Sequence, residues 1–88
     1  MSETQMYYNP DLATDTLIVR YAIGSQEREA VVRSNGHSLK DHVERLQGLR
    51  ENAEYTSKGP AASWAPWTLA TGGGIFIRLD SIIAIEAP

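Results

Sequence analysis

The chain has 88 residues, which is the size of one domain, and its net charge of −3 at pH 7 argues against general nucleic-acid binding. It contains no cysteine, which excludes disulfides, cysteine-ligated zinc and thiol nucleophiles. No apolar run reaches the ~18 residues of a membrane span, and the N-terminus is too polar for a signal peptide. We therefore expect a cytoplasmic protein.

Residues 1–15 are predicted to form an N-terminal arm, because Pro10 and the polar residues around it break any periodic pattern. Met6, Tyr7 and Tyr8 are the exception, as three bulky side chains in a row. They pack either on their own domain, which is the simpler interpretation, or on a partner. Tyr7 and Tyr8 are therefore candidate partner-binding residues. Residues 16–88 are predicted to form a single small β-rich domain.

Two strands are predicted next, over Thr16–Ile23 and Glu27–Ser34. The first is rich in β-branched and aromatic residues that alternate along the chain, so that one of its faces is fully apolar. The second has charged residues on one face beside Val31. Because GSQ separates them as a turn, the two strands are predicted to form an antiparallel hairpin with one solvent-exposed face.

A helix is predicted over about residues 38–52, after the turn at Asn35-Gly36. Ser38 and Asp41 have the spacing of a capping box, with Asp in place of Glu. One stripe of this helix is apolar and is expected to face the core; it consists of Leu39, Val43, Leu46, Leu49 and Ala53. His37 is expected in the preceding turn and His42 on the exposed face. Their five-residue spacing does not suit a two-histidine metal site, so no metal is expected.

A loop is predicted over about residues 53–66, and it is longer than most connections in small domains. It contains Trp64 among small residues, and Tyr55 near its start. Because long loops often carry function, Trp64 and Tyr55 are candidates for contacting a partner. A place in the core remains an equal alternative for Trp64, and Trp67 is expected to be part of the core.

The final segment, WTLATGGGIFIRLDSIIAIEAP, places Gly72, Gly73 and Gly74 between two apolar runs. A phosphate-binding loop needs a helix directly after its glycines, and a P-loop ends in Lys followed by Ser or Thr. Neither follows here, because both flanks alternate with the period of a strand. The glycines are therefore predicted to turn a hairpin. Asp80-Ser81 then predicts a corner, with Asp80 capping a single helical turn, before a last strand over Ile82–Glu86.

This order of a tryptophan-started strand, a glycine turn, IFIRLDSI and IAIE resembles the closing part of small Sm-like or SH3-like barrels, and also the ends of short uncharacterised bacterial and phage proteins. The resemblance covers residues 67–88. It implies a strongly bent sheet and a tendency to form rings or dimers. It brings no functional residues with it.

The predicted fold is α+β: a small, strongly bent antiparallel sheet of about five strands, partly open and barrel-like, with one helix inserted after the second strand. No constellation typical of catalysis is present, so the protein is not expected to be an enzyme, and no cofactor is expected. The first hypothesis is a non-enzymatic interaction protein that self-associates and docks on a protein partner. It would be a phage or bacterial accessory or inhibitor factor, with Trp64, Tyr55, Tyr7 and Tyr8 at its contact surface.

Two alternatives remain open. In one, an oligomer takes up a nucleotide or phosphate through Arg78, Arg33 and the backbone amides of Gly72, Gly73 and Gly74, because arginine binds phosphate bidentately. The simpler interpretation of Arg78 is a surface ion pair with Asp80. In the other, a barrel-like domain binds nucleic acid, which the acidic charge disfavours.

Overall fold

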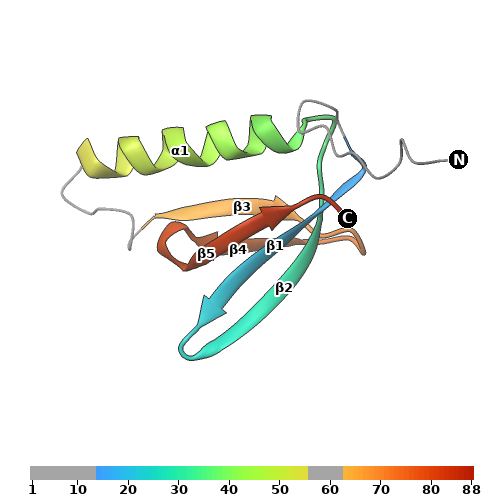
Figure 1. The fold of residues 1–88 in the computed structure, drawn as a ribbon, viewed down its shortest axis with the longest axis horizontal. Coiled ribbons are helices and arrows are strands. Elements are labelled where there is room, and N and C mark those ends of the chain that lie inside the picture. The colour runs from blue at the N-terminus through green and yellow to red at the C-terminus, as the bar shows by residue number, and fades with distance from the viewer. Residues whose placement is uncertain (1–13, 56–62) are drawn as a thin grey trace, which may run out of the picture.

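The computed structural model describes residues 14–55 and 63–88, which form one α-helix and five β-strands (Figure 1). Every strand pair is antiparallel, and the helix follows the second strand. The predicted α+β fold is therefore confirmed. Most of the predicted N-terminal arm, including Tyr7 and Tyr8, lies outside the described residues.

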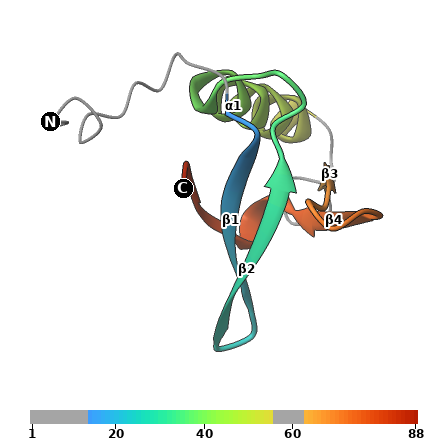
Figure 2. The same ribbon diagram turned by 90° about the vertical axis from the view of Figure 1, so that its right-hand side faces the viewer.

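Strands β1 (Thr16–Ile23) and β2 (Gln26–Arg33) form the predicted hairpin, from Thr16 opposite Arg33 to Ile23 opposite Gln26. The chain reverses at Gly24, whose φ of 61° is in the left-handed region that glycine enters without steric cost. The tip of this hairpin extends away from the helix (Figure 2). The two long strands give the fold its main sheet.

Strand β5 (Ile82–Glu86) pairs with the other side of β1, so the order of this sheet is β2-β1-β5. Strands β3 (Trp64–Thr68) and β4 (Gly74–Arg78) form a second, two-stranded sheet. The sheets meet where Val32 bridges Leu69, beside a hydrogen bond from the Ala70 N–H to the Val31 carbonyl oxygen of 2.9 Å. The described strands do not close into a barrel.

The glycine segment turns the β3–β4 hairpin, as predicted. Gly72 and Gly73 have φ values of 105° and 78°. The Leu69 N–H donates to the Gly73 carbonyl oxygen, and the Gly72 N–H donates to the Leu69 carbonyl oxygen, both at 3.0 Å. A strand follows Gly74 directly, so these glycines do not lead into a helix.

A 3₁₀ turn, η3 (Leu79–Ser81), joins β4 to β5. Its N-cap residue is Arg78, and no side chain caps it. Asp80 lies within the turn, so the prediction that Asp80 caps it is wrong. The buried Leu79 fixes the turn instead.

Helix α1 (Leu39–Tyr55) begins at the predicted capping box and ends beyond the predicted Asn52. The Asp41 N–H donates to Ser38 Oγ at 3.1 Å, and the Ser38 N–H donates to Asp41 Oδ2 at 3.2 Å. This reciprocal pair satisfies two backbone donors that a helix start otherwise leaves without partners.

The helix lies along one side of the strands (Figure 1), where Leu39, Leu46 and Leu49 pack against the core. Val43 belongs to the predicted apolar stripe of the helix but is 39% exposed, because it borders a groove between α1 and β5. The buried core residues come from β1, β2, β3, β4 and the η3 turn, and they are Leu17, Val19, Ala30, Val32, Ala65, Trp67, Ile77 and Leu79.

Two glycine substitutions are expected to change stability in opposite directions. Gly73→Ala places a Cβ at a φ of 78° and should lower the free energy of unfolding by roughly 1–2 kcal/mol. Gly48→Ala adds a Cβ that meets no atom within 4 Å in α1, and should raise it by about 1 kcal/mol. Urea unfolding of both variants measures the two values. Changes of the same sign would contradict the described backbone at one of the two sites.

Candidate functional site

The β3–β4 sheet sorts its side chains into an inner and an outer set. Along β3, Ala65 and Trp67 are buried, while Trp64, Pro66 and Thr68 are exposed. Opposite them, the pairs are Trp64 with Arg78 and Pro66 with Phe76. Since paired residues share a face of the sheet, the outer side carries two aromatic rings and a guanidinium group.

The outer side of this sheet exposes large apolar side chains. The exposed fraction is 53% for Trp64 and 66% for Phe76, and the two are diagonal neighbours across the strands. Ile23, at the end of β1, is 54% exposed, and it lines a pocket of about 300 Å³ together with Trp64, Phe76 and Arg78. We refer to Ile23, Trp64, Phe76 and Arg78 as the aromatic face.

The charge on the aromatic face is compensated. Arg78 NH2 lies 3.3 Å from Asp80 Oδ2, and both side chains are partly exposed. This is the ion pair that the simpler interpretation of Arg78 predicted. The aromatic face therefore offers apolar contact area with a neutral ion pair at its border.

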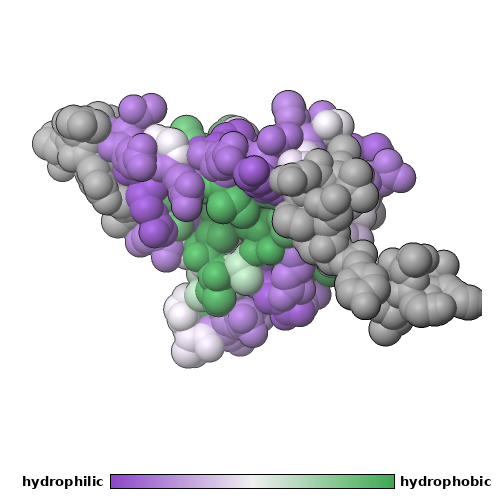
Figure 3. Space-filling model, turned by 45° about the horizontal axis from the view of Figure 1, so that its top comes forward, coloured by the Kyte–Doolittle hydropathy of each residue, from purple (hydrophilic) through white to green (hydrophobic). Residues whose placement is uncertain are grey.

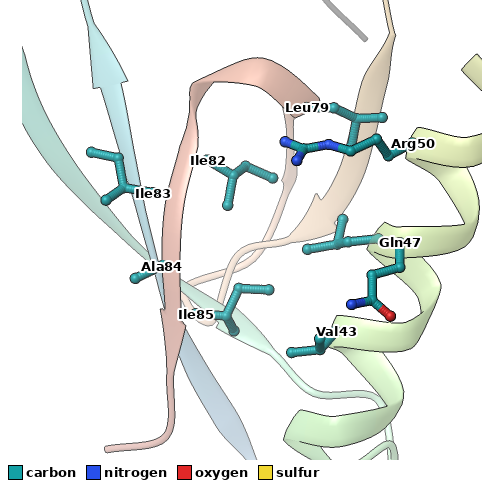
Figure 4. A pocket seen from close by; sticks show the side chains of 9 residues that line it. Val43, Gln47, Arg50, Leu79, Ile82, Ile83, Ala84 and Ile85 are labelled. Atoms are coloured by element: carbon teal, nitrogen blue, oxygen red, sulfur yellow. The ribbon is translucent and has the colours of Figure 1, made fainter. Parts of the chain in front are cut away.

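A second apolar surface lies between α1 and β5. Figure 3 shows it between the polar outer side of the helix and the polar tip of the β1–β2 hairpin. It contains a groove of about 290 Å³, in which Ile82 and Ile85 point toward Val43 and Gln47 of the helix (Figure 4). Ile83 points to the other side of β5 and is 55% exposed. We refer to this surface as the β5 groove.

The residues predicted to hold a phosphate are only partly brought together. Arg33 NH2 donates to the Ala70 carbonyl oxygen at 3.3 Å, so it lies beside the glycine turn. Arg78 is at the opposite end of β4 from Gly74, and it pairs with Trp64 instead. The predicted cradle therefore separates into two distant parts.

The remaining predicted contact residues have different outcomes. Trp64, expected in a loop, opens strand β3 and is exposed. Tyr55 is the last residue of α1, and its side chain lies outside the described part of the protein. Sequence reasoning missed Phe76, although its position two residues before Arg78 in an alternating strand places both on one face.

His42 is buried, so the prediction that it faces solvent is wrong. Its Nε2 lies 2.9 Å from the Ser34 carbonyl oxygen, which can only accept, so Nε2 carries the proton. Its ring lies 5.7 Å from that of Trp67. Burial lowers the pKa of His42, with smaller effects from the nearby Arg45 and His37, while the Ser34 hydrogen bond and Asp41 oppose the shift.

Residues 14–55 and 63–88 contain no cluster of three or more His, Cys, Asp or Glu side chains placed to hold a metal ion. In the same residues, none of the helical structure has the length and apolar character needed to cross a membrane. Comparisons add no relative: no protein-family model, curated protein or solved structure matches this chain.

Acid is expected to destabilise the protein through His42. Because its pKa is lowered in the folded state, the unfolded chain binds more protons below the ordinary value of 6.5. The free energy of unfolding should therefore fall as pH drops below about 6.5, by at most ~1.4 kcal/mol per pH unit from this one proton. Urea unfolding of the wild type and of His42→Gln at pH 7.5, 6.5 and 5.5 measures the difference between their slopes.

The matched control is His37→Gln, since His37 is exposed in the turn before the helix. The His42→Gln variant should lose less stability on acidification than either the wild type or this control. Parallel pH profiles for all three proteins would show that His42 is not buried in its neutral form.

Proposed function

We propose that this is a small non-enzymatic interaction protein that docks on a protein partner through the aromatic face. The supporting observation is the exposure of Trp64 and Phe76 side by side on a sheet whose opposite side forms the core. Tryptophan and arginine are enriched among the residues that dominate the energy of protein interfaces. Burying such rings yields roughly 25 cal/mol per Å² of apolar surface, so an exposed pair favours association.

A protein partner fits this surface better than a nucleic acid. Platforms that stack single-stranded bases combine aromatic rings with a positively charged groove. Here Arg78 is paired with Asp80, and Glu27 lies across from Ala22, which lines the same pocket. The net charge of −3 also disfavours the binding of a nucleic acid. The nucleic-acid alternative therefore has less support.

The proposal includes self-association through the β5 groove. Within the described sheet β5 bonds only to β1, so its outer edge has backbone groups available for another strand. The apolar residues of the groove border this edge. Two copies can pair β5 with β5 in antiparallel order, which buries Ile83 and the groove together and uses one symmetric contact.

The wider setting is part of the same proposal. A chain without cysteine suits the reducing cytoplasm, and the resemblance of residues 67–88 to phage and bacterial proteins suggests an accessory or inhibitor factor. The alternative of a nucleotide store built on Arg78 and the glycine turn loses support, since these two lie at opposite ends of β4.

Truncating the aromatic face is expected to abolish docking. Immobilised wild type, Trp64→Ala and Phe76→Ala are compared as baits in lysate of the cells that naturally contain the protein, and retained proteins are quantified by mass spectrometry. For a partner that the wild type retains, calorimetry should show at least ~30-fold weaker binding by each variant, as for residues that contribute ≥2 kcal/mol.

Val31→Ala is the matched control, because Val31 is an exposed apolar residue of β2 outside both surfaces. It should bind like the wild type, and circular dichroism should show all variants folded. Unchanged retention by Trp64→Ala and Phe76→Ala would contradict docking through the aromatic face. A wild type that sediments as a monomer at every concentration would contradict the self-association.

A further inference from the structure

A third pocket, of about 370 Å³, lies where the end of β2, the first half of α1 and β3 meet. Arg33, His37, His42, Arg45 and Trp67 are among the residues that line it, and none of its lining residues is acidic. We refer to it as the basic pocket. It is an accumulation of positive charge in a chain whose net charge is −3.

The arginine charges in the basic pocket have no carboxylate partner among the described residues. The Arg45 guanidinium lies 4.8 Å from the centre of the Trp67 ring, and burial lowers the pKa of Arg45. Arg33 donates to a backbone carbonyl oxygen at 3.3 Å, on Ala70. A guanidinium has five N–H donors, so both side chains retain most of their capacity to bind an anion.

Among the described residues, the nearby acids form no ion pair with Arg33 or Arg45. Asp41 Oδ2 lies 3.8 Å from His37 Nδ1, but the same oxygen accepts the Ser38 N–H in the capping box. Asp15 lines a neighbouring pocket that Arg33 also borders, and within the described residues it forms no ion pair with Arg33. The electrostatic environment of the basic pocket therefore favours an anionic ligand.

Two buried polar atoms at this pocket lack partners among the described residues: Trp67 Nε1 and His42 Nδ1. Both side chains are only 5% exposed. The indole N–H can only donate, and a buried donor without an acceptor costs free energy. The imidazole Nδ1 is an acceptor, because Nε2 carries the proton of the neutral ring. An acceptor oxygen of a ligand would therefore complete the indole N–H of Trp67.

We propose that the basic pocket binds the phosphate group of a small phosphate monoester. A phosphate dianion offers three terminal oxygens, which suits two guanidinium groups and an indole N–H better than the two oxygens of a carboxylate. The pocket has room for the phosphate and part of the group that it esterifies. The Arg45 guanidinium lies over the Trp67 ring, so both groups line the pocket next to each other.

This site shares Arg33 with the phosphate site predicted from the sequence, but it uses neither Arg78 nor Gly72–Gly74. It is also separate from the aromatic face, because Trp67 is on the opposite side of β3 from Trp64. Phosphate binding in the basic pocket is therefore independent of docking on a protein partner through the aromatic face.

The test titrates the full chain with inorganic phosphate, AMP, adenosine and acetate. NMR follows the two indole N–H signals, and calorimetry gives the affinities. Phosphate and AMP should bind and move the Trp67 signal while the Trp64 signal stays in place. Adenosine and acetate should not bind at the same concentrations. If AMP binds more tightly than inorganic phosphate, the pocket also contacts the esterified group. If the two bind equally, the pocket contacts the phosphate alone.

Arg33→Gln and Arg45→Gln should each weaken phosphate binding about tenfold or more, as expected for lost charge-assisted hydrogen bonds. Arg28→Gln, on the exposed surface of β2, is the matched control and should bind normally. Arg33 is exposed, so its variant keeps the test valid if Arg45→Gln does not fold. Absence of phosphate binding, equal binding of adenosine, undiminished binding by the arginine variants, or movement of the Trp64 signal alone would overturn the proposal.

Discussion

The register of β3 against β4 is the constraint on which both the aromatic face and the basic pocket depend. The glycine turn sets it, through the reciprocal hydrogen bonds between Leu69 and the Gly72–Gly73 backbone. Because side chains in a strand alternate with a period of two, this register puts Trp67 into the core and Trp64 into solvent. A slip of one residue would exchange the two sides of the hairpin.

The same hairpin therefore has two roles that are coupled by geometry. Its inner side contributes Ala65, Trp67 and Ile77 to the core, and Trp67 also forms a wall of the basic pocket. Its outer side presents the aromatic face. Since the two-stranded sheet joins the rest of the fold near Val32 and Leu69, the position of both surfaces relative to β1 and β2 is fixed at that contact. Stability and proposed function thus rest on one short element.

Local signals in the sequence were sufficient for much of this fold. Alternation identified the β1–β2 hairpin, the Ser38–Asp41 spacing identified the start of α1, and the absence of a helix pattern after Gly74 identified the turn. Strand β3 was harder, because Pro66 cannot donate to a ladder and small residues precede it. Pro66 is tolerated here because β3 has only one full partner strand. The burial of His42 depends on tertiary contacts with Ser34 and Trp67, which helical periodicity alone does not reveal.

The most direct measurement of this account is the solvent access of the two tryptophans. Trp67→Phe leaves Trp64 as the only indole, and Trp64→Phe leaves Trp67. Acrylamide quenching of fluorescence in these two variants compares one indole that is 53% exposed with one that is 5% exposed. We predict strong quenching and red-shifted emission for Trp64, and weak quenching with blue-shifted emission for Trp67. Equal quenching, or the reverse order, would contradict the register of the β3–β4 hairpin.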